Sequence, residues 1–377
     1  MPYPRWCLRP KTYLTVIRII INVSLFTLVY LTVFGYPPVR IGDSLGLNVS
    51  SNPLVLGLIF DLPVVGWLSY RVWKNGLTRY ALRAVYAWLG VCFIALMALI
   101  PWEVLVWVLG IPQPLSGALA LGVVGVLVAW GITNANRFRI KRFSLSSPKL
   151  SAPLRLVHVS DVHIGSRRPQ FLHSVVQIIN HQKPDVVAIT GDLIDFEGIQ
   201  AEDLSALANL AAPSYFCIGN HERYVDCDAI CERLRALGVN VLRNESIASN
   251  AIGFVGIDDA DDKRQVGKQL AGIEWAKDTF SVLLYHRPDD FESAAKHGFD
   301  LMLAGHTHNG QIAPFNYLVK TQFPQIAGLY EEGDSRLYVS TGTGTWGPPL
   351  RLGSVNEIAV FDLAPTKASG LPKESQS

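Results

Sequence analysis

Four long apolar stretches in the first 150 residues constrain the fold of this chain more than any other feature. They cover about residues 13–35, 53–70, 82–102 and 115–133, and each is close to the roughly 20 residues that a helix needs to cross a hydrocarbon core. The stretches are apolar on every side, whereas a surface helix of a soluble domain needs a polar face. The sequence therefore predicts an all-α transmembrane domain of about four helices over residues 1–142.

The balance of basic and acidic residues also changes where the apolar stretches end. Residues 1–150 hold 14 Lys and Arg against 3 Asp and Glu, and residues 151–377 hold 19 against 28. Basic residues precede the first stretch, separate the second from the third, and follow the fourth, whereas the other two loops contain only Arg40. Because cytoplasmic loops are enriched in Lys and Arg, we expect a multi-pass inner (cytoplasmic) membrane protein whose second half lies on the cytoplasmic side.

Two charged residues lie inside the predicted spans. Arg18 is near the basic end of the first span, so its side chain can reach the headgroup region. Asp61 is deeper, and a carboxylate at that depth indicates either a structural ion pair, for example with Arg18, or a polar pathway. Both interpretations of Asp61 stay open.

The second half changes in pattern. Residues 143–153 are rich in Ser and Pro and predict a linker, and residues 365–377 predict a disordered tail. Between them, over residues 154–364, short β-rich runs alternate with amphipathic helices, which predicts an α/β domain. Strands are expected at 154–160, 185–190, 215–218, 252–257, 280–285, 301–304, 337–340 and 358–363, and helices at 170–181, 204–211, 229–237 and 290–296.

Five polar clusters end strand-like runs of this domain. They are Asp161-Val162-His163, Gly191-Asp192, Gly219-Asn220-His221-Glu222, Tyr285-His286 and Gly305-His306-Thr307-His308. Five of the nine histidines of the chain belong to them, which scattered surface histidines would not do. Loops at strand ends build the sites of α/β domains, and imidazole combined with carboxylate suits divalent transition metals. The clusters therefore predict a two-metal site.

The order of these motifs resembles the calcineurin-like metallophosphoesterase superfamily over about residues 154–364. The segments Thr190 to Asp195, Gly305 to Gln311 and Thr343 to Pro349 further resemble a membrane-anchored bacterial branch of predicted phosphohydrolases. The resemblance implies a four-layer α/β/β/α sandwich with two mixed sheets, here preceded by the membrane domain.

The same resemblance implies a dinuclear metal centre. It assigns Asp161, His163 and His308 to one metal ion, Asn220, His286 and His306 to the other, and Asp192 to a bridge between them. His221 would be the general acid, with Glu222 placed to orient it. Mn, Fe, Zn and Co all suit such ligands, so the identity of the two divalent ions stays open. Arg223, Arg287, Asn309 and Gln311 flank the motifs and are either phosphate contacts or merely exposed.

These residues predict hydrolysis of phosphoester or pyrophosphate bonds by attack of a hydroxide that bridges two metal ions. Attachment to the bilayer favours a lipid-linked phosphodiester or pyrophosphate as the substrate. The acidic second half lacks a basic footprint, so no nucleic-acid partner is expected. The alternative is a membrane transport or sensing protein regulated by a phosphoesterase-like domain, which Asp61 would support. The oligomeric state is left open.

Overall fold

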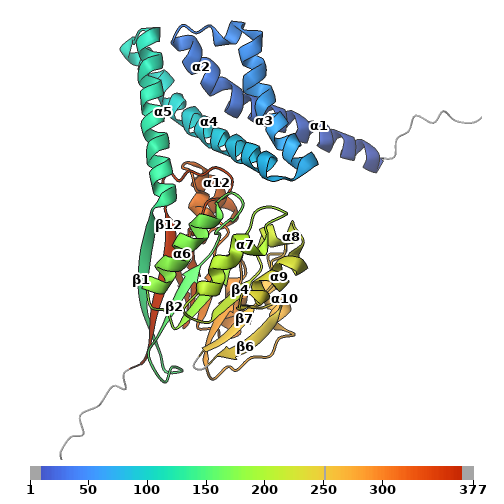
Figure 1. Ribbon diagram of the computed structural model, residues 1–377, viewed down its shortest axis with the longest axis vertical. Helices are drawn as coiled ribbons and strands as arrows, with labels where there is room; N and C mark the ends of the chain where they lie inside the picture. The colour runs from blue at the N-terminus through green and yellow to red at the C-terminus, as the bar shows by residue number, and fades with distance from the viewer. Residues whose placement is uncertain (1–9, 250–251, 367–377) are drawn as a thin grey trace, which may run out of the picture. The chain divides into compact units, whose positions relative to one another are not determined.

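The computed structural model describes residues 10–249 and 252–366 and divides the chain into two compact units. The first unit is Met1–Ala129 and the second is Trp130–Ser377. Apart from Pro365 and Thr366, the predicted tail lies outside the described residues. The ribbon in Figure 1 shows helices alone in the first unit and two sheets with helices in the second.

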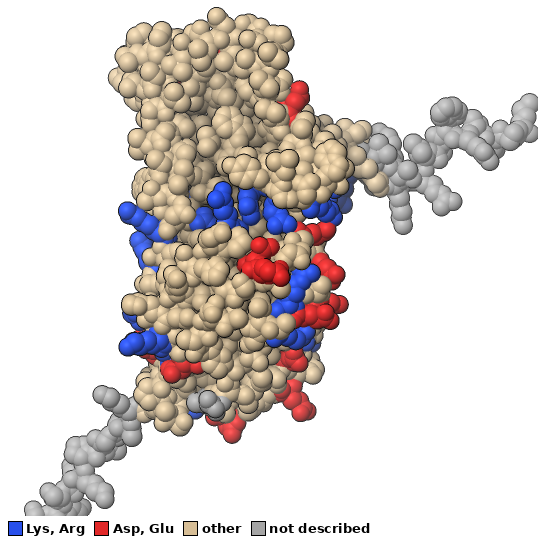
Figure 2. Space-filling model, in the orientation of Figure 1, with Lys and Arg blue, Asp and Glu red and all other residues tan. Residues whose placement is uncertain are grey.

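The first unit contains long apolar helices. α1 spans Pro10–Tyr30 and continues through a π-helical segment, Leu31–Gly35, into α2, Tyr36–Ser44. A short 3-10 turn at Val49–Ser51 precedes α3, Pro53–Trp73, α4, Gly76–Leu109, and α5, Gln113–Asn136. Four helical stretches are long and apolar enough to cross a membrane: Ile17–Ser44, Pro53–Trp73, Gly76–Leu109 and Gln113–Asn136. The prediction of four long apolar helices is confirmed, and the face of this unit drawn in Figure 2 consists mostly of residues other than Lys, Arg, Asp and Glu.

Polar residues set the ends of these helices. The Asn52 side chain accepts hydrogen bonds from the N–H groups of Leu54 and Val55 at the start of α3. Asn75 caps α4 together with Thr78, and Gly110 ends α4 in the left-handed conformation at φ 63°. Such caps satisfy backbone groups that have no partner within the helix, which is why each helix stops where it does.

Arg40, which was predicted in a loop, lies in a helix and pairs with a carboxylate of another helix. Arg40 belongs to α2 and Glu103 to α4, and Arg40 Nε lies 2.7 Å from a Glu103 carboxylate oxygen. Asp61 is exposed on α3 and, in the described part of the chain, forms no ion pair with Arg18. The structural pairing of Asp61 with Arg18 is therefore not observed.

The second unit contains two six-stranded mixed sheets. The first has the order β1-β12-β2-β3-β4-β5, from Phe138–Ser147, Asn356–Pro365, Leu154–Val159, Val186–Thr190, Ser214–Cys217 and Val239–Val241. The second has the order β10-β11-β9-β8-β7-β6, from Gly328–Glu332, Ser335–Val339, Leu301–Ala304, Phe280–Leu284, Ile252–Gly256 and Glu245–Ser249. In each sheet four consecutive strands run parallel: β2 to β5 in the first, and β11, β9, β8 and β7 in the second.

Three apolar cores separate four layers. Helices α6, Pro169–His181, and α9, Cys227–Ala236, cover one face of the first sheet with residues such as Leu172 and Leu234. The inner faces of both sheets meet in a second core, where Tyr215 stacks on Phe254 with ring centroids 4.3 Å apart. Helices α10, Gln265–Leu270, and α11, Phe291–Lys296, cover the second sheet. The second unit is therefore the expected α/β/β/α sandwich.

The linker prediction is wrong for residues 143–147, because these residues complete β1. This strand runs parallel to β12 in continuous register from Phe138 to Ser147. Phe143 stacks on Phe361 of β12 at 5.2 Å, and Leu145 is buried. Apolar Phe143 and Leu145 alternate with exposed Ser144 and Ser146, which is the period of a half-buried strand. The segment after α5 therefore enters the sheet directly.

Smaller differences concern short elements. The helix expected at 204–211 is a turn of α-helix, α7 at Ala201–Leu204, followed by a 3-10 segment at Ser205–Asn209. Strands β5, β6 and β10 and helix α12, Phe315–Gln322, were not predicted. Pairing of strands distant in the chain decides such short elements more than local sequence does.

Candidate metal centre

The predicted donor residues follow the carboxyl ends of neighbouring parallel strands. Asp161 and His163 follow β2, Asp192 follows β3, and Asn220 begins the short helix α8, Asn220–Arg223, just after β4. In the second sheet His286 follows β8, and both His306 and His308 follow β9. Because parallel neighbours end at one edge of a sheet, these loops meet where the two sheets face each other.

Left-handed backbone turns aim the donors. Asp161, His163 and Asp192 have φ values of 55°, 57° and 48°, and His306 and His308 have values of 70° and 50°. Non-glycine residues rarely adopt this left-handed backbone conformation, because it is strained. Such strained residues are typical of functional sites. Strand alternation does not orient Asp161 and His163, since β2 ends at Val159. The two side chains converge because of these turns.

Two glycines allow the loops to approach each other. A Cβ atom at Gly191, which has φ 73°, would lie 2.5 Å from the backbone nitrogen of Gly219 and 2.8 Å from Nδ1 of His286. A Cβ atom at Gly305 would lie 2.1 Å from a carboxylate oxygen of Asp161. Only glycine fits at these positions without moving the donors.

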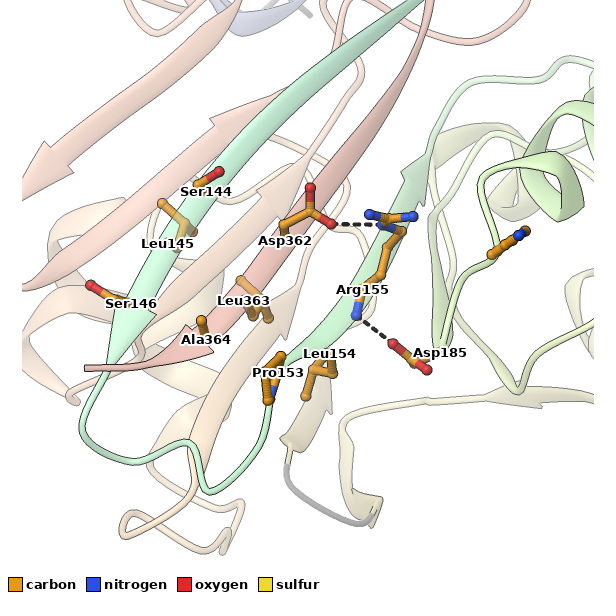
Figure 3. A pocket seen from close by; sticks show the side chains of 11 residues that line it. Ser144, Leu145, Ser146, Pro153, Leu154, Arg155, Asp185, Asp362, Leu363 and Ala364 are labelled. Carbon is orange, nitrogen blue, oxygen red and sulfur yellow. Dashed lines mark hydrogen bonds and ion pairs between the residues drawn. The ribbon is translucent and has the colours of Figure 1, made fainter. Parts of the chain in front are cut away.

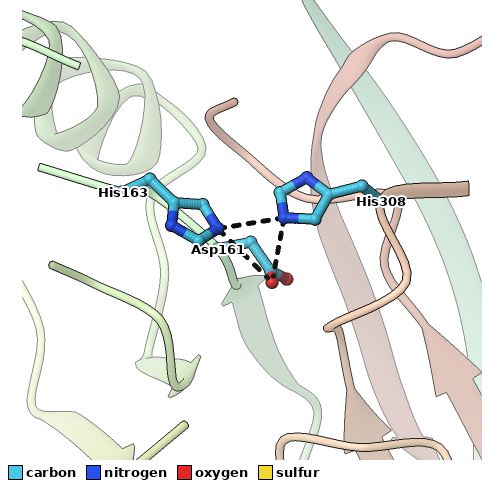
Figure 4. Close-up of side chains that lie close together, drawn as sticks. All are labelled: Asp161, His163 and His308. Atoms are coloured by element: carbon cyan, nitrogen blue, oxygen red, sulfur yellow. Dashed lines mark hydrogen bonds and ion pairs between the residues drawn. The ribbon is translucent and has the colours of Figure 1, made fainter. Parts of the chain in front are cut away.

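The first donor group consists of Asp161 and His163 from the loop after β2 and His308 from the loop after β9, and Figure 4 shows the three side chains pointing toward one another. The Nε2 atoms of the two histidines are 2.9 Å apart, and His308 Nε2 lies 3.3 Å from Asp161 Oδ1. All three side chains are buried. One ligand atom from each can reach the same cation.

The second donor group consists of Asp192, His286 and His306. His286 Nε2 lies 3.1 Å from Asp192 Oδ2, 3.2 Å from Asn220 Oδ1 and 3.2 Å from His306 Nδ1. The same Asp192 oxygen is 4.0 Å from His163 Nε2 of the first group. Asp192 therefore lies between the two groups, where a bridging carboxylate would be needed.

The charge balance of these residues fits divalent cations. Asp161 and Asp192 are 0% and 2% exposed, and in the described chain neither has a Lys or Arg within ion-pair distance. Buried carboxylates without a compensating charge are costly. Despite its burial, the pKa of His286 is raised to about 10 because Asp192 is so close. The site attracts positive charge, and oxygen with imidazole donors suits Mn, Fe, Zn or Co.

Two other ligand candidates are neutral. Burial lowers the pKa of His308 to about 4, and burial together with nearby His286 lowers the pKa of His306 to about 3. A neutral imidazole has the lone pair that coordination requires. Thr190 fixes another ligand, because its carbonyl oxygen lies 2.8 Å from His286 Nδ1 and leaves Nε2 free for a cation.

His221 lies beside both donor groups and is oriented by an unexpected carboxylate. Its Nδ1 is 3.0 Å from Asp195 Oδ1, and its Nε2 is 3.9 Å from Asp192 Oδ2. Asp195 also contacts Nδ1 of His163. Although burial alone would lower it, the pKa of His221 is raised to about 9 by Asp192 and Asp195. His221 is therefore protonated near neutral pH, as a general acid must be.

The prediction that Glu222 orients His221 is wrong. The Glu222 carboxylate is fully buried and accepts hydrogen bonds from the backbone N–H groups of Asp192, Leu193, Ile194 and Gly219, at 2.7 to 3.2 Å. Glu222 holds together the loops after β3 and β4. The sequence analysis did not identify Asp195 as a site residue, although its position three residues after Asp192 could have indicated that it belongs to the site.

Arg351 is a second residue that the sequence analysis missed. It is fully buried, and its guanidinium lies 3.2 Å from His308 Nδ1 and donates to the carbonyl oxygens of Gly342 and Gly344. Its own backbone N–H donates to the carbonyl oxygen of Gly131 in the last turns of α5. Arg351 thus contacts a donor of the first group and the end of a transmembrane helix.

The flanking polar residues have other partners. Arg223 Nη1 lies 2.7 Å from Asp259 Oδ2, Arg287 Nε lies 2.6 Å from Asp259 Oδ1, and both arginines also reach Asp261. Gln311 is buried and holds the loop at Trp346, donating to its carbonyl oxygen at 2.9 Å and accepting from its N–H. These contacts position the loops around the donors.

A surface cleft of about 510 Å³ lies at the opposite end of the first sheet (Figure 3). It is lined by the starts of β2 and the ends of β1 and β12. Arg155 lies 2.6 Å from Asp362 there, and its N–H donates to Asp185. Arg155 and Asp362 pair with each other, and the cleft contains none of the donor residues.

Fold and donor set together define a metallophosphoesterase-type sandwich. A model of the calcineurin-like phosphoesterases matches residues 154–310. An uncharacterized metallophosphoesterase of Campylobacter jejuni is 34% identical over 257 residues, which are 65% of this chain and 69% of that protein. A Danio rerio transmembrane protein with a metallophosphoesterase domain is 32% identical over 274 residues, 64% of this chain and 61% of that protein. The chain belongs to the calcineurin-like metallophosphoesterases.

Two solved structures are similar to this chain at lower sequence identity. The GAP50 anchor protein of Plasmodium has 13% sequence identity and a TM-score of 0.34, covering 54% of this chain and 77% of that chain. A Mycobacterium tuberculosis phosphopantetheinyl hydrolase has 14% identity and a TM-score of 0.33, covering 53% and 92%.

Proposed function

We propose that this protein is a membrane-anchored phosphohydrolase with a dinuclear metal centre. The observation that carries the proposal is the position of Asp192, whose Oδ2 lies 3.1 Å from Nε2 of His286 in its own group and 4.0 Å from Nε2 of His163 in the other. A carboxylate placed in this way can share its oxygens between two cations. The nearby His221 supplies a proton donor on the same edge of the centre.

The ligand assignment follows the two groups. Asp161, His163 and His308 would hold one cation, Asn220, His286 and His306 the other, and Asp192 both. When bound, two divalent cations supply Lewis-acid activation of the phosphoryl group and of the attacking water. Asp195 holds His221 by its Nδ1, so that Nε2 faces the centre with a proton for the leaving oxygen.

The membrane helices favour a particular kind of substrate. A catalytic unit tethered to a bilayer meets lipid-linked phosphodiesters and pyrophosphates at high effective concentration. The distribution of Lys and Arg supports a position on the cytoplasmic side. A reporter fused after residue 366 would be active outside the cytoplasm if this orientation were reversed.

Hydrolysis of bis-p-nitrophenyl phosphate by the full-length protein in nanodiscs tests the proposed activity. The protein is stripped of metal and then supplied with Mn²⁺, and its metal content is measured by mass spectrometry. We expect two bound metal ions per chain and metal-dependent turnover. A fragment beginning at residue 144 would be unsuitable, since it removes half of β1.

Three variants give this experiment its controls. Asp192→Ala should lose both metal occupancy and turnover. His221→Ala should keep two metal ions and lose about 10² to 10⁴ in rate, the usual contribution of a general acid. His173→Ala, on the exposed face of α6, should behave like the parent protein. Two bound metals without turnover of any phosphoester would contradict the enzymatic function.

Asp61 supports the alternative of transport or sensing, because it is exposed on α3 and makes no ion pair with Arg18 among the described residues. An unpaired carboxylate in a membrane span is costly and marks a functional position. A cellular phenotype of Asp61→Ala with unchanged phosphodiester hydrolysis would favour this alternative. An unaltered phenotype would remove its main support.

A further inference from the structure

Exposed apolar side chains of the second unit are confined to two places. Within its described residues, the exposed large hydrophobic side chains fall into two sets. Trp130 and Ile132 lie at the end of α5, and the others lie in α12 or in loops near the metal centre: Tyr224, Phe315, Tyr317, Leu318 and Trp346. The remaining described residues of the sandwich present no such side chain. A concentration of exposed apolar residues on a water-soluble surface marks an interaction site.

Helix α12 carries three of these seven residues. It spans Phe315–Gln322 and has no buried residue. Tyr317 is 73% exposed and Leu318 62% exposed. The helix contains one basic residue, Lys320, and no acidic residue. Aromatic and aliphatic side chains beside a cation are typical of helices that lie in a membrane interface.

The end of α5 locates α12 relative to a bilayer. The apolar run of α5 ends at Ile132, and Thr133 and Asn134 lead to the basic segment that starts at Arg137. Residues 131–134 therefore lie at the boundary between hydrocarbon and headgroups if α5 spans the membrane. Whatever part of the second unit packs on these residues must lie at the same depth.

A short series of contacts leads from this boundary to α12. The Arg351 N–H donates to the Gly131 carbonyl oxygen at 3.0 Å, and the Asn134 side chain donates to the Arg351 carbonyl oxygen at 3.3 Å. The neighbouring Leu352 pairs with Gln311 and Ala313 through backbone hydrogen bonds of 3.0 and 2.7 Å. α12 begins two residues after Ala313. It therefore lies beside the level at which α5 leaves the membrane.

The same helix adjoins the metal centre at both of its ends. His308 and Gln311 precede it, and Phe323 follows it and packs edge-on against His306 with ring centroids 5.0 Å apart. Across the centre, Trp346 lies 6.4 Å and Tyr224 lies 5.8 Å from His221 between ring centroids. The exposed apolar side chains thus form a rim around the donor residues.

We propose that α12, together with Trp346, inserts into the headgroup region of the bilayer next to α5 and holds the metal centre at the membrane surface. The partner of this surface is the lipid bilayer. Tyr317 and Leu318 contact acyl chains near their glycerol ends, and Lys320 faces anionic phosphates. A lipid headgroup phosphate could then reach the metal centre without leaving the bilayer. That consequence rests on the proposed function, whereas the lipid contact does not.

Photocrosslinking to lipid tests this contact directly. The full-length protein, with p-benzoylphenylalanine in place of Tyr317, is reconstituted into vesicles of phosphatidylethanolamine and phosphatidylglycerol that contain an alkyne-tagged phosphatidylethanolamine. The matched control carries the same probe in place of Glu245, which is exposed on β6 at the opposite edge of the second sheet. We expect a lipid adduct at position 317 and none at position 245.

Further variants separate this proposal from the enzymatic one. The adduct at position 317 should persist in an Asp192→Asn background, where turnover is lost. It should fall several-fold with Leu318→Ser and be kept with Leu318→Ile, because the apolar face drives insertion. Equal adducts at both positions, an adduct with a second protein chain, or no adduct at position 317 would each overturn the proposal.

Discussion

At the residue scale, a single carboxylate links metal binding to proton transfer. Asp195 contacts Nδ1 of both His163 and His221. These two histidines hold its pKa below the usual range despite complete burial. Its negative charge keeps the His221 imidazolium in place and orients the His163 ring. Neither histidine could keep its orientation without a partner for its second nitrogen.

We therefore expect Asp195→Asn to lower turnover about 10² to 10⁴-fold, as loss of an orienting acid does in comparable sites. It should also shift the pH profile. His221 must be protonated to act, and Asp195 helps to raise the pKa of this side chain, so activity falls at alkaline pH. Loss of the Asp195 charge lowers this pKa and moves the alkaline decline to lower pH.

The measurement is kcat/KM for bis-p-nitrophenyl phosphate between pH 6 and 10 in the parent protein and the variant. Glu197→Gln, two residues along the same loop, serves as the control. An alkaline decline at an unchanged pH in Asp195→Asn would mean that Asp195 does not orient the acid.

At the element scale, the centre depends on how the loops after β3 and β4 are joined. The fully buried Glu222 carboxylate accepts hydrogen bonds from four backbone N–H groups of these two loops. Such an acceptor fixes the relative position of Asp192 and Asn220, which belong to different loops. Glu222 therefore stabilises the geometry of the metal centre through hydrogen bonds to backbone N–H groups, one of which belongs to the expected ligand Asp192.

Glu222→Gln should destabilise the catalytic unit by about 2 to 4 kcal/mol, since the amide nitrogen replaces one acceptor and leaves buried N–H groups unpaired at about 1 to 3 kcal/mol each. Thermal unfolding of the full-length protein, followed by the near-ultraviolet circular dichroism signal, measures this loss. Glu245→Gln, at an exposed position of β6, should change stability by less than about 0.5 kcal/mol. Equal stability of the two variants would contradict the role of Glu222.

The sequence predicted some elements and not others for a physical reason. The strands that carry the donors are continuous apolar runs, because parallel strands covered on both faces have little polar surface. Residues 143–147 of β1 were assigned to a linker, since Ser and Pro are frequent in residues 143–153. Its pairing with β12, more than 200 residues away in the chain, makes it a strand. The local composition of a segment does not show which distant strand it will pair with.

At the scale of the whole molecule, a buried histidine makes stability depend on pH. His158 is 1% exposed, lies 2.7 Å from Thr190 Oγ1 and packs edge-on against Tyr338 between the two sheets. Burial lowers its pKa to about 4. The folded protein thus keeps His158 neutral where the unfolded chain, with an ordinary pKa near 6.5, is protonated.

The free energy of unfolding therefore decreases as the pH falls from about 6.5 to 4. His158 accounts for about 3 kcal/mol of this decrease and contributes no further loss below pH 4. Denaturant unfolding of the metal-loaded protein at pH 7 and pH 4.5 measures the loss. His158→Gln should show a smaller loss between the two pH values than the parent protein. The exposed control, His173→Gln, should match the parent. An identical loss in all three proteins would exclude His158 as the source.

The sequence by itself determined the transmembrane helices, the α/β class and the donor residues, because each depends on local features: the length of apolar runs, strand periodicity and residue type at strand ends. The tertiary structure alone decided that Asp195 orients His221, that Glu222 joins two loops, and that Arg351 connects α5 to His308. Each of these depends on which segments meet in space. Hydrogen bonds between distant loops depend on the three-dimensional approach of their partners, and sequence spacing does not specify that approach.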